Sequence, residues 1–171
     1  MWKACLLTIV SAALLCAAGE LSGRRAPGFS LPDSSAQQYD PQDYRGKVLL
    51  VDFMQANCPH CATFSRILEQ VKAKYGDRVA ILSIVNPPSD QQSVAKYRAD
   101  NKVTTPILFD CGQVAYSYLK PKSPQIAVPH VFLIDADGVI RNDFGFSPAR
   151  KDIFEGKGIF AEIDKLLGPK K

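Results

Sequence analysis

The chain has 171 residues, of which 46% are hydrophobic, and its formal net charge is +4. This size suits one domain with a single hydrophobic core. The 21 Lys and Arg residues face 17 Asp and Glu residues and are not gathered into a run, so the charge pattern argues against nucleic-acid binding.

Residues 1–18 have the layout of a secretory signal peptide. Lys3 precedes a short apolar stretch, and small residues follow at Ala17 and Ala18. The stretch is too short and wrongly flanked for a stable membrane span. We expect cleavage near Ala18, export to the periplasm or another extracytoplasmic space, and one domain of residues 19–171. An uncleaved membrane anchor is the alternative.

Cleavage after residue 18 leaves three cysteines: Cys58, Cys61 and Cys111. Three are too few for a framework of structural disulfides in an exported protein. A close pair with one thiol left over indicates cysteines that are used chemically.

The first half of the chain predicts a strand followed by a helix. Residues 19–46 are rich in Pro, Gly, Ser and Asp and predict only short extended pieces. Val48–Phe53 is nearly all apolar, as in a strand covered on both faces. Residues 61–75 carry an apolar stripe at helical spacing, with Pro59 fitting the first turn and Gly76 ending the helix.

A second strand and helix follow. Val79–Val85 predicts another buried strand. Ser89 and Gln92 have the spacing of a capping box for a helix that runs to about Asn101. Pro106–Phe109 predicts a short strand.

The last part of the chain predicts a short helix at Cys111–Leu119, a hairpin and a final helix over residues 159–167. The hairpin strands are Val131–Ile134 and Val139–Asn142, joined by the turn sequence Asp-Ala-Asp-Gly. Together the elements predict an α/β fold. Its central mixed β-sheet is parallel in the middle, has an antiparallel hairpin at one edge, and is flanked by helices on both faces.

The sequence Cys-Pro-His-Cys over residues 58–61 is the most informative motif. The spacing alone also serves as half of a zinc site. Here it follows a predicted strand and opens a helix, whose free N–H groups and positive dipole end stabilise a thiolate at Cys58. Because the thiolate is the species that attacks disulfides, the motif indicates a redox site.

Four segments in this order resemble the TlpA/ResA-like exported thiol–disulfide oxidoreductases of the thioredoxin fold, within the AhpC/TSA–redoxin superfamily. They are GKVLLVDF at residues 46–53, CPHC at 58–61, FDCGQVA at 109–115 and VPHVFLIDADG at 128–138. With their spacing they span most of residues 27–168. The resemblance implies a thioredoxin-like fold and a Cys58–Cys61 disulfide as the only redox group, with no other cofactor.

The resemblance also assigns roles at the pair. Cys58 is implied as the exposed attacking thiol and Cys61 as the thiol that resolves the mixed disulfide. Asp52 matches the buried acid of thioredoxins, where a raised pKa suits a proton shuttle for Cys61. A carboxyl at a strand end that only binds water is the alternative for Asp52.

Pro59 and His60 are expected to tune the pair. A protonated His60 favours the Cys58 thiolate, and a stabilised reduced form makes the disulfide a stronger oxidant.

Val128, Pro129 and His130 are the expected substrate-binding residues. Pro129 matches the cis-proline of the family, and the backbone of Val128 is placed to pair with an extended substrate segment. An ordinary trans bond at a strand start is the alternative for Pro129. His130 can equally point to the other face of the sheet, because side chains alternate along a strand.

The chain departs from the family at three positions. Met54 and Asn57 stand where thioredoxin-like proteins often have tryptophan, and Phe64 stands where many TlpA-like reductases have glutamate. The Pro-His dipeptide resembles DsbA-type oxidants, although their large helical insertion is missing. We therefore favour an oxidant, with a TlpA-like reductant in cytochrome c maturation as the alternative.

Three other classes of protein are alternatives to a thiol–disulfide oxidoreductase. A peroxiredoxin needs Pro-x-x-x-Thr/Ser-x-x-Cys, but Val51 and Gln55 occupy those places before Cys58. A copper chaperone using both thiols and a histidine remains open, although copper carriers of this fold have a wider cysteine spacing. The third class is a structural domain with a static Cys58–Cys61 bond. Such a bond closes too small a loop to add much stability.

Cys111 begins the predicted helix after Pro106–Phe109. If Val79–Val85 lies between that strand and Val48–Phe53, two strand spacings of about 10 Å separate Cys111 from the pair, which exceeds the roughly 7 Å limit for a disulfide. We expect a buried free cysteine that packs as a small apolar residue. An auxiliary resolving thiol is the alternative.

The expected partners are proteins with cysteine thiols or disulfides and a membrane redox protein, and the expected state is a monomer.

Overall fold

The computed structural model describes residues 21–123 and 125–168. The expected signal peptide, Cys5 and Cys16 lie outside these residues. The described chain forms a central five-stranded sheet in the order β5-β4-β3-β6-β7. These strands are β3 (Val48–Met54), β4 (Val79–Val85), β5 (Ile107–Phe109), β6 (His130–Ile134) and β7 (Ile140–Gly145).

The sheet is mixed. β3 pairs in parallel with β4, and β4 in parallel with β5. β6 runs antiparallel to β3, and the β6–β7 hairpin closes that edge. The parallel centre and antiparallel edge hairpin predicted from the sequence are confirmed, as is the place of β4 between β3 and β5.

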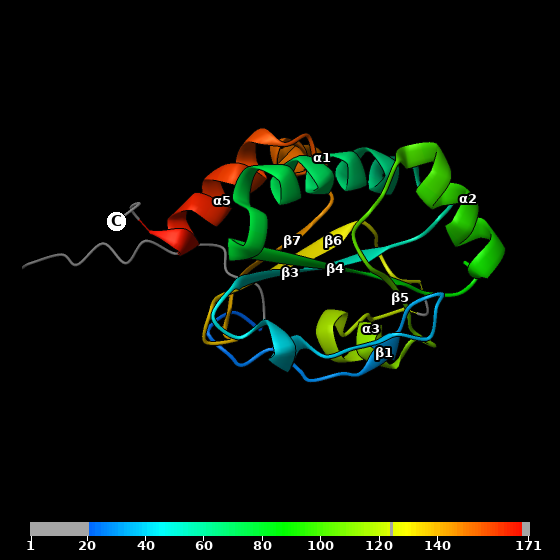
Figure 1. Ribbon diagram of the computed structural model, residues 1–171, viewed down its shortest axis with the longest axis horizontal. Helices are drawn as coiled ribbons and strands as arrows, with labels where there is room; N and C mark the ends of the chain where they lie inside the picture. The colour runs from blue at the N-terminus through cyan, green and yellow to red at the C-terminus, as the bar shows by residue number, and fades with distance from the viewer. Residues whose placement is uncertain (1–20, 124, 169–171) are drawn as a thin grey trace, which may run out of the picture.

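Helices cover both faces of the sheet. Figure 1 shows α1, α2 and α5 above the sheet and α3, with the N-terminal segment, below it. The helices are α1 (Pro59–Tyr75), α2 (Gln91–Asn101), α3 (Gln113–Leu119), α4 (Lys151–Phe154) and α5 (Lys157–Leu167). The minor elements are β1 (Leu31–Pro32), β2 (Gln38–Tyr39) and the 3-10 helices η1 (Pro41–Tyr44), η2 (Gly76–Arg78) and η3 (Pro148–Arg150).

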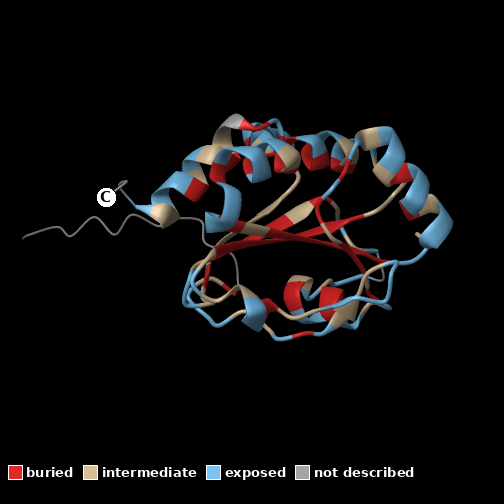
Figure 2. Cartoon of the chain, in the orientation of Figure 1, coloured by how far each residue is buried: buried red, intermediate tan, exposed pale blue. Residues whose placement is uncertain are grey.

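The central strand β3 is buried along its whole length, which accounts for its nearly continuous apolar sequence. Successive side chains point to opposite faces. Val48 and Leu50 pack under α1 and α5, whereas Leu49, Val51 and Phe53 pack toward α3. Figure 2 shows the resulting band of buried residues through the middle of the molecule.

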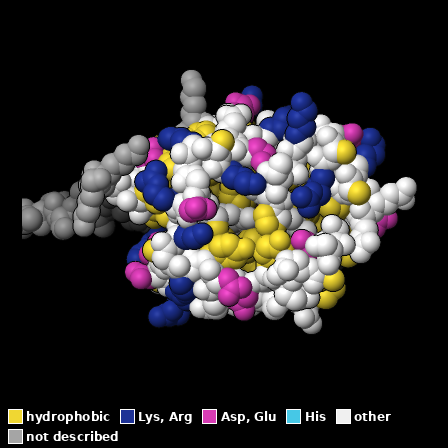
Figure 3. Space-filling model, in the orientation of Figure 1, with side chains coloured by type: hydrophobic (Ala, Val, Ile, Leu, Met, Phe, Trp, Pro, Cys, Tyr) yellow, Lys and Arg dark blue, Asp and Glu magenta, His cyan; other side chains and the backbone are white. Residues whose placement is uncertain are grey.

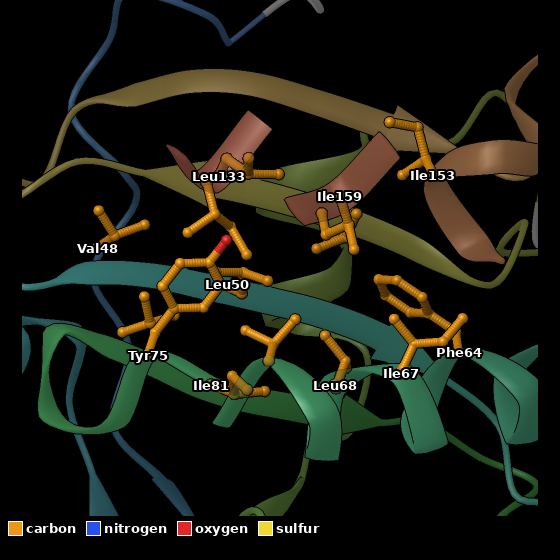
Figure 4. Packing of buried hydrophobic residues seen from close by; sticks show 14 of the residues in the cluster. Val48, Leu50, Phe64, Ile67, Leu68, Tyr75, Ile81, Leu133, Ile153 and Ile159 are labelled. Atoms are coloured by element: carbon orange, nitrogen blue, oxygen red, sulfur yellow. The ribbon is translucent and has the colours of Figure 1, made fainter. Parts of the chain in front are cut away.

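The larger part of the core lies between the sheet and α1, α4 and α5. In Figure 4 side chains from these elements point toward one another around Leu50, Leu68 and Ile159. Burying each such side chain contributes about 1.5–3 kcal/mol relative to exposure. This packing fixes the first turn of α1 above the carboxyl end of β3, where the redox motif lies.

Two predicted helix starts were wrong. α3 begins at Gln113 and not at Cys111, because Gly112 adopts a φ of 111° that is outside the helical range. The capping box of α2 is formed by Asp90 and Ser93, not by the pair one residue earlier. Ser89 instead accepts a hydrogen bond from the backbone N–H of Ala56 at 3.1 Å, which ties the loop before α2 to the loop before α1.

Basic and acidic side chains are interspersed over the face shown in Figure 3, around an apolar area near its centre. Among the described residues, no helix has both the length and the apolar character needed to cross a membrane.

Candidate active site

The cysteine pair sits at the start of α1. Cys58 is the N-cap residue, Pro59 occupies the first turn, and the backbone N–H of Cys61 donates to Cys58 Sγ at 3.1 Å. The two sulfurs form a disulfide, and their Cα atoms are 5.2 Å apart. The Cys58 sulfur is thus held against the positive end of a 17-residue helix.

The two sulfurs differ in their access to solvent. Cys61 is only 1% exposed and packs with Met54 and Val85, whereas Cys58 is half-buried at the edge of the same cluster. Beside Cys58, a surface groove of about 340 Å³ runs between α1 and α2, with Ala62 and Tyr97 in its lining. An incoming sulfur can therefore reach Cys58 more readily than Cys61.

Asp52 is a buried carboxyl on the face of the sheet that α1 covers. It is 1% exposed, and in register it lies between Ser83 of β4 and Val131 of β6. Burial raises the pKa of Asp52 to about 7, and a long 3.5 Å hydrogen bond from Ser83 only partly opposes this rise. Its Oδ1 atom is buried and has no hydrogen-bond partner. Asp52 is thus poised to hold or release a proton near neutral pH.

His60 is exposed, and its ring stacks on Phe146. The ring centroids are 4.1 Å apart, with 26° between the planes. Phe146 follows β7 and also contacts Phe154, which packs in turn on Phe64 of α1. The contact between Phe146 and His60 could not be predicted from the sequence, because no spacing or motif links Phe146 to the cysteine pair.

The segment before β6 also reaches the pair. The Val128–Pro129 peptide bond is cis, and Pro129 is buried. Val128 packs against the cluster that contains Cys61 and at whose edge Cys58 lies. The carbonyl of Pro129 accepts a hydrogen bond from the N–H of Phe146 at 3.0 Å. Residues 58–61, 128–129 and 146 are therefore neighbours in the fold.

His130 belongs to a different environment. Its ring stacks on Phe132, with centroids 4.8 Å apart, and its Nε2 atom lies 3.1 Å from Asp143 Oδ1. Phe132 packs on Tyr118 of α3. The His130 ring thus lies on the face of the sheet opposite α1, which is the second of the two orientations expected from the sequence.

Cys111 is a free cysteine, and the prediction that it is buried was wrong, because it is exposed. The residue before it, Asp110, is buried instead. Asp110 is 4% exposed, accepts hydrogen bonds from Asn86 Nδ2 at 2.9 Å and Ala115 N at 2.8 Å, and so turns the next side chain toward solvent.

The described residues include no cluster of metal-binding side chains. Within residues 21–123 and 125–168, no three His, Cys, Asp or Glu side chains gather as they would around a metal ion.

Comparisons with known proteins agree with this arrangement. The chain is 29% identical over 127 residues to the thioredoxin-like protein YneN of Bacillus subtilis, covering 72% of this chain and 71% of that protein. It is 27% identical over 133 residues to the thiol-disulfide oxidoreductase ResA of Geobacillus kaustophilus, covering 77% and 73% of the two chains.

A solved structure extends the likeness to the fold. The solution structure of a thiol:disulfide interchange protein from a Bacteroides species superposes with a TM-score of 0.69 at 20% identity, over 88% of this chain and 93% of that one. The AhpC/TSA family profile matches residues 22–143. With its thioredoxin fold and its Cys58–Cys61 disulfide, the chain belongs to the AhpC/TSA family.

Proposed function

We propose that the protein is a thiol–disulfide oxidoreductase that exchanges its Cys58–Cys61 disulfide with cysteines of other proteins. The observation that carries this proposal is the asymmetry of the pair. Cys58 is half-buried beside a groove at a helix N-terminus, and Cys61 is buried one turn deeper. A bond between an accessible and an inaccessible sulfur is open to attack at one end only.

The oxidising reaction has two steps. A substrate thiolate attacks Cys58 Sγ, the Cys58–Cys61 bond breaks, and its electron pair passes to Cys61 Sγ, which takes up a proton. A second substrate thiolate then attacks the substrate sulfur of the mixed disulfide and releases Cys58 as a thiolate. The substrate loses two electrons and two protons, and the cysteine pair gains the electrons.

Asp52 has the role of proton donor and acceptor for Cys61. When the bond breaks, the protonated carboxyl supplies the proton that Cys61 takes up. In the reverse direction, the carboxylate removes that proton so that Cys61 can attack Cys58. A carboxyl with a pKa of about 7 exists in both forms at neutral pH, which supports this role directly or through a water molecule.

The substrates in this proposal are proteins with cysteine thiols or disulfides. The proposed contacts for the residues around a substrate cysteine are the groove between α1 and α2, which Cys58 lines, and the backbone of Val128, a residue that packs against the same cluster as Cys58. An extended substrate segment can pair with that backbone. His130 has no direct substrate contact in this arrangement, because its ring lies toward α3.

We assign the direction as oxidation of substrate thiols, since a protonated His60 between the two cysteines favours the Cys58 thiolate and with it the reduced pair. Reduction of substrates, as in cytochrome c maturation, is the competing direction. In the same proposal residues 1–18 direct export, residues 19–171 form the working domain, and a membrane redox protein restores the disulfide of a monomeric protein. In this proposal the electrons pass through the Cys58–Cys61 disulfide.

The test is turnover with a peptide that contains two cysteines. The oxidised protein should convert the peptide dithiol to a disulfide in proportion to the protein added, and the Cys58→Ser variant should not. The Cys111→Ala variant is the matched control, because it removes a thiol outside the site. Peptide oxidation by the Cys58→Ser variant at the normal rate would rule out the proposal, and stoichiometric copper bound through the thiols would favour the chaperone instead.

A further inference from the structure

Phe146 occupies a junction between the two parts of the site. Its ring lies over the imidazole of His60, with centroids 4.1 Å apart and planes 26° from parallel. Its backbone N–H donates to the carbonyl of Pro129 at 3.0 Å. One residue after β7 thus contacts both the redox motif and the segment before β6.

The ring of Phe146 is itself held in place from the other side. It packs edge-on against Phe154, with centroids 5.5 Å apart, and Phe154 is 1% exposed. Phe154 in turn packs against the fully buried Phe64 at 4.9 Å. The stack therefore joins an exposed imidazole to the core between α1 and α4, whereas a free histidine at a helix start would sample several rotamers.

A near-parallel stack acts on the imidazole in two ways. It fixes the ring plane, and the negative face of the phenyl ring attracts a cationic ring above it. His60 lies between the two cysteines in the first turn of α1. A protonated imidazole at that position stabilises the Cys58 thiolate and, through it, the reduced pair.

We propose that Phe146 is a positioning residue that fixes the ring of His60, the residue directly before Cys61, and so makes the Cys58–Cys61 disulfide more oxidising. This inference rests on the proposed function and adds the residue that orients its tuning group. A purely structural role for Phe146, as an apolar cover on Phe154, predicts a loss of stability without a change in the redox equilibrium.

The experiment is a double-mutant cycle on the full chain in glutathione buffers. The measured quantity is the equilibrium constant between the cysteine pair and glutathione, in the wild type, Phe146→Leu, His60→Ala and the double variant. We expect Phe146→Leu to shift the constant about two- to fivefold toward the disulfide form, in the same direction as His60→Ala. In the His60→Ala background, Phe146→Leu should have no further effect.

Two variants control for packing. Phe146→Tyr keeps an aromatic face over His60 and should restore the wild-type constant. Phe144→Leu removes another half-buried ring that packs at the edge of the same core but has no contact with His60, and it should leave the constant unchanged. If Phe146→Leu does not fold, Phe146→Met supplies the same removal of the ring with a more flexible apolar side chain.

The outcomes separate the two proposals. A wild-type pair that titrates with glutathione, together with an unchanged constant in Phe146→Leu, overturns the role of Phe146 and leaves the oxidoreductase intact. An equal shift in the wild-type and His60→Ala backgrounds also overturns it, because the ring then acts by another route. A wild-type pair that does not titrate at all contradicts the proposed function itself.

Discussion

The backbone N–H of Cys61 points at the sulfur of Cys58, at a distance of 3.1 Å. This contact places the Cys58 sulfur where a free N–H group of the first helical turn can stabilise a negative charge. The helix start thus favours one sulfur of the pair as the attacking and leaving group toward substrates.

The first prediction concerns the order of the two cysteines. The Cys61→Ser variant should accumulate mixed disulfides between Cys58 and proteins that carry a disulfide, because the Cys58 thiolate still attacks that disulfide and the Cys61 thiol that would release the bond is missing. The Cys58→Ser variant should trap almost none, since Cys61 is 1% exposed. Non-reducing gels followed by peptide mass spectrometry identify the trapped sulfur. Trapping through Cys61 in the Cys58→Ser variant would reverse the assigned roles.

The second prediction concerns His60. The His60→Ala variant should have a less oxidising disulfide, because the thiolate of the reduced pair loses a cationic neighbour. Equilibration with glutathione, read by alkylation and mass spectrometry, measures the change. Lys96→Ala, which removes a cation from the groove lining on α2, is the control for a general charge effect. An unchanged equilibrium in the His60→Ala variant would mean that the helix start alone stabilises the thiolate.

The third prediction concerns Asp52 and pH. Burial raises the pKa of Asp52 from 3.8 to about 7, so between these values the folded protein binds a proton that the unfolded chain has released. The stability that this proton provides is complete below about pH 4 and is lost as the pH rises to about 7. The loss is on the order of 4 kcal/mol at about 1.4 kcal/mol per pKa unit.

The Asp52→Asn variant tests this linkage. Urea unfolding of the oxidised protein should show a gain in stability over the wild type that is small at pH 4 and several kcal/mol larger at pH 8, an order-of-magnitude value from the same linkage. Ser83→Ala is the matched control, because it removes the hydrogen bond to Asp52 and leaves the carboxyl in place. Parallel pH profiles for the wild type and Asp52→Asn would contradict the raised pKa.

The fourth prediction concerns Cys111. Because its side chain is exposed, a thiol reagent should modify it rapidly in the native oxidised protein, and the Cys111→Ala variant should oxidise or reduce substrates at nearly the wild-type rate. Peptide mass spectrometry after short labelling checks the modification, and turnover of the peptide with two cysteines checks the rate. A Cys58–Cys111 or Cys61–Cys111 bond detected during turnover would show that this thiol takes part.

The sequence allowed the sheet and the cysteine pair to be predicted because the signals for both are local. The apolar run of β3 and the placement of Cys58 directly after it define a strand, a turn and a helix start within a few residues. Asp52 could be predicted for a related reason, since an acid within a buried strand is unfavourable unless it has a role.

The features that could not be predicted from the sequence depend on contacts between residues that are far apart in the chain. Phe146 meets His60 only through the packing of β7 and α4 against α1, and no periodicity in the sequence records that contact. Cys111 was misplaced because the hydrogen bonds of Asp110 with Asn86 and Ala115 decide which of two adjacent side chains is buried. The orientation of His130 follows from strand alternation and could be stated from the sequence only as one of two possibilities.

The redox potential of the Cys58–Cys61 pair, measured against a series of glutathione buffers, tests the central claim most directly. The account predicts a two-electron titration with a potential above that of thioredoxin, about −270 mV, toward that of the oxidant DsbA, about −120 mV. A potential at or below about −270 mV would contradict the assigned direction. A bond that stays oxidised below about −300 mV would behave as a structural disulfide and contradict the oxidoreductase itself.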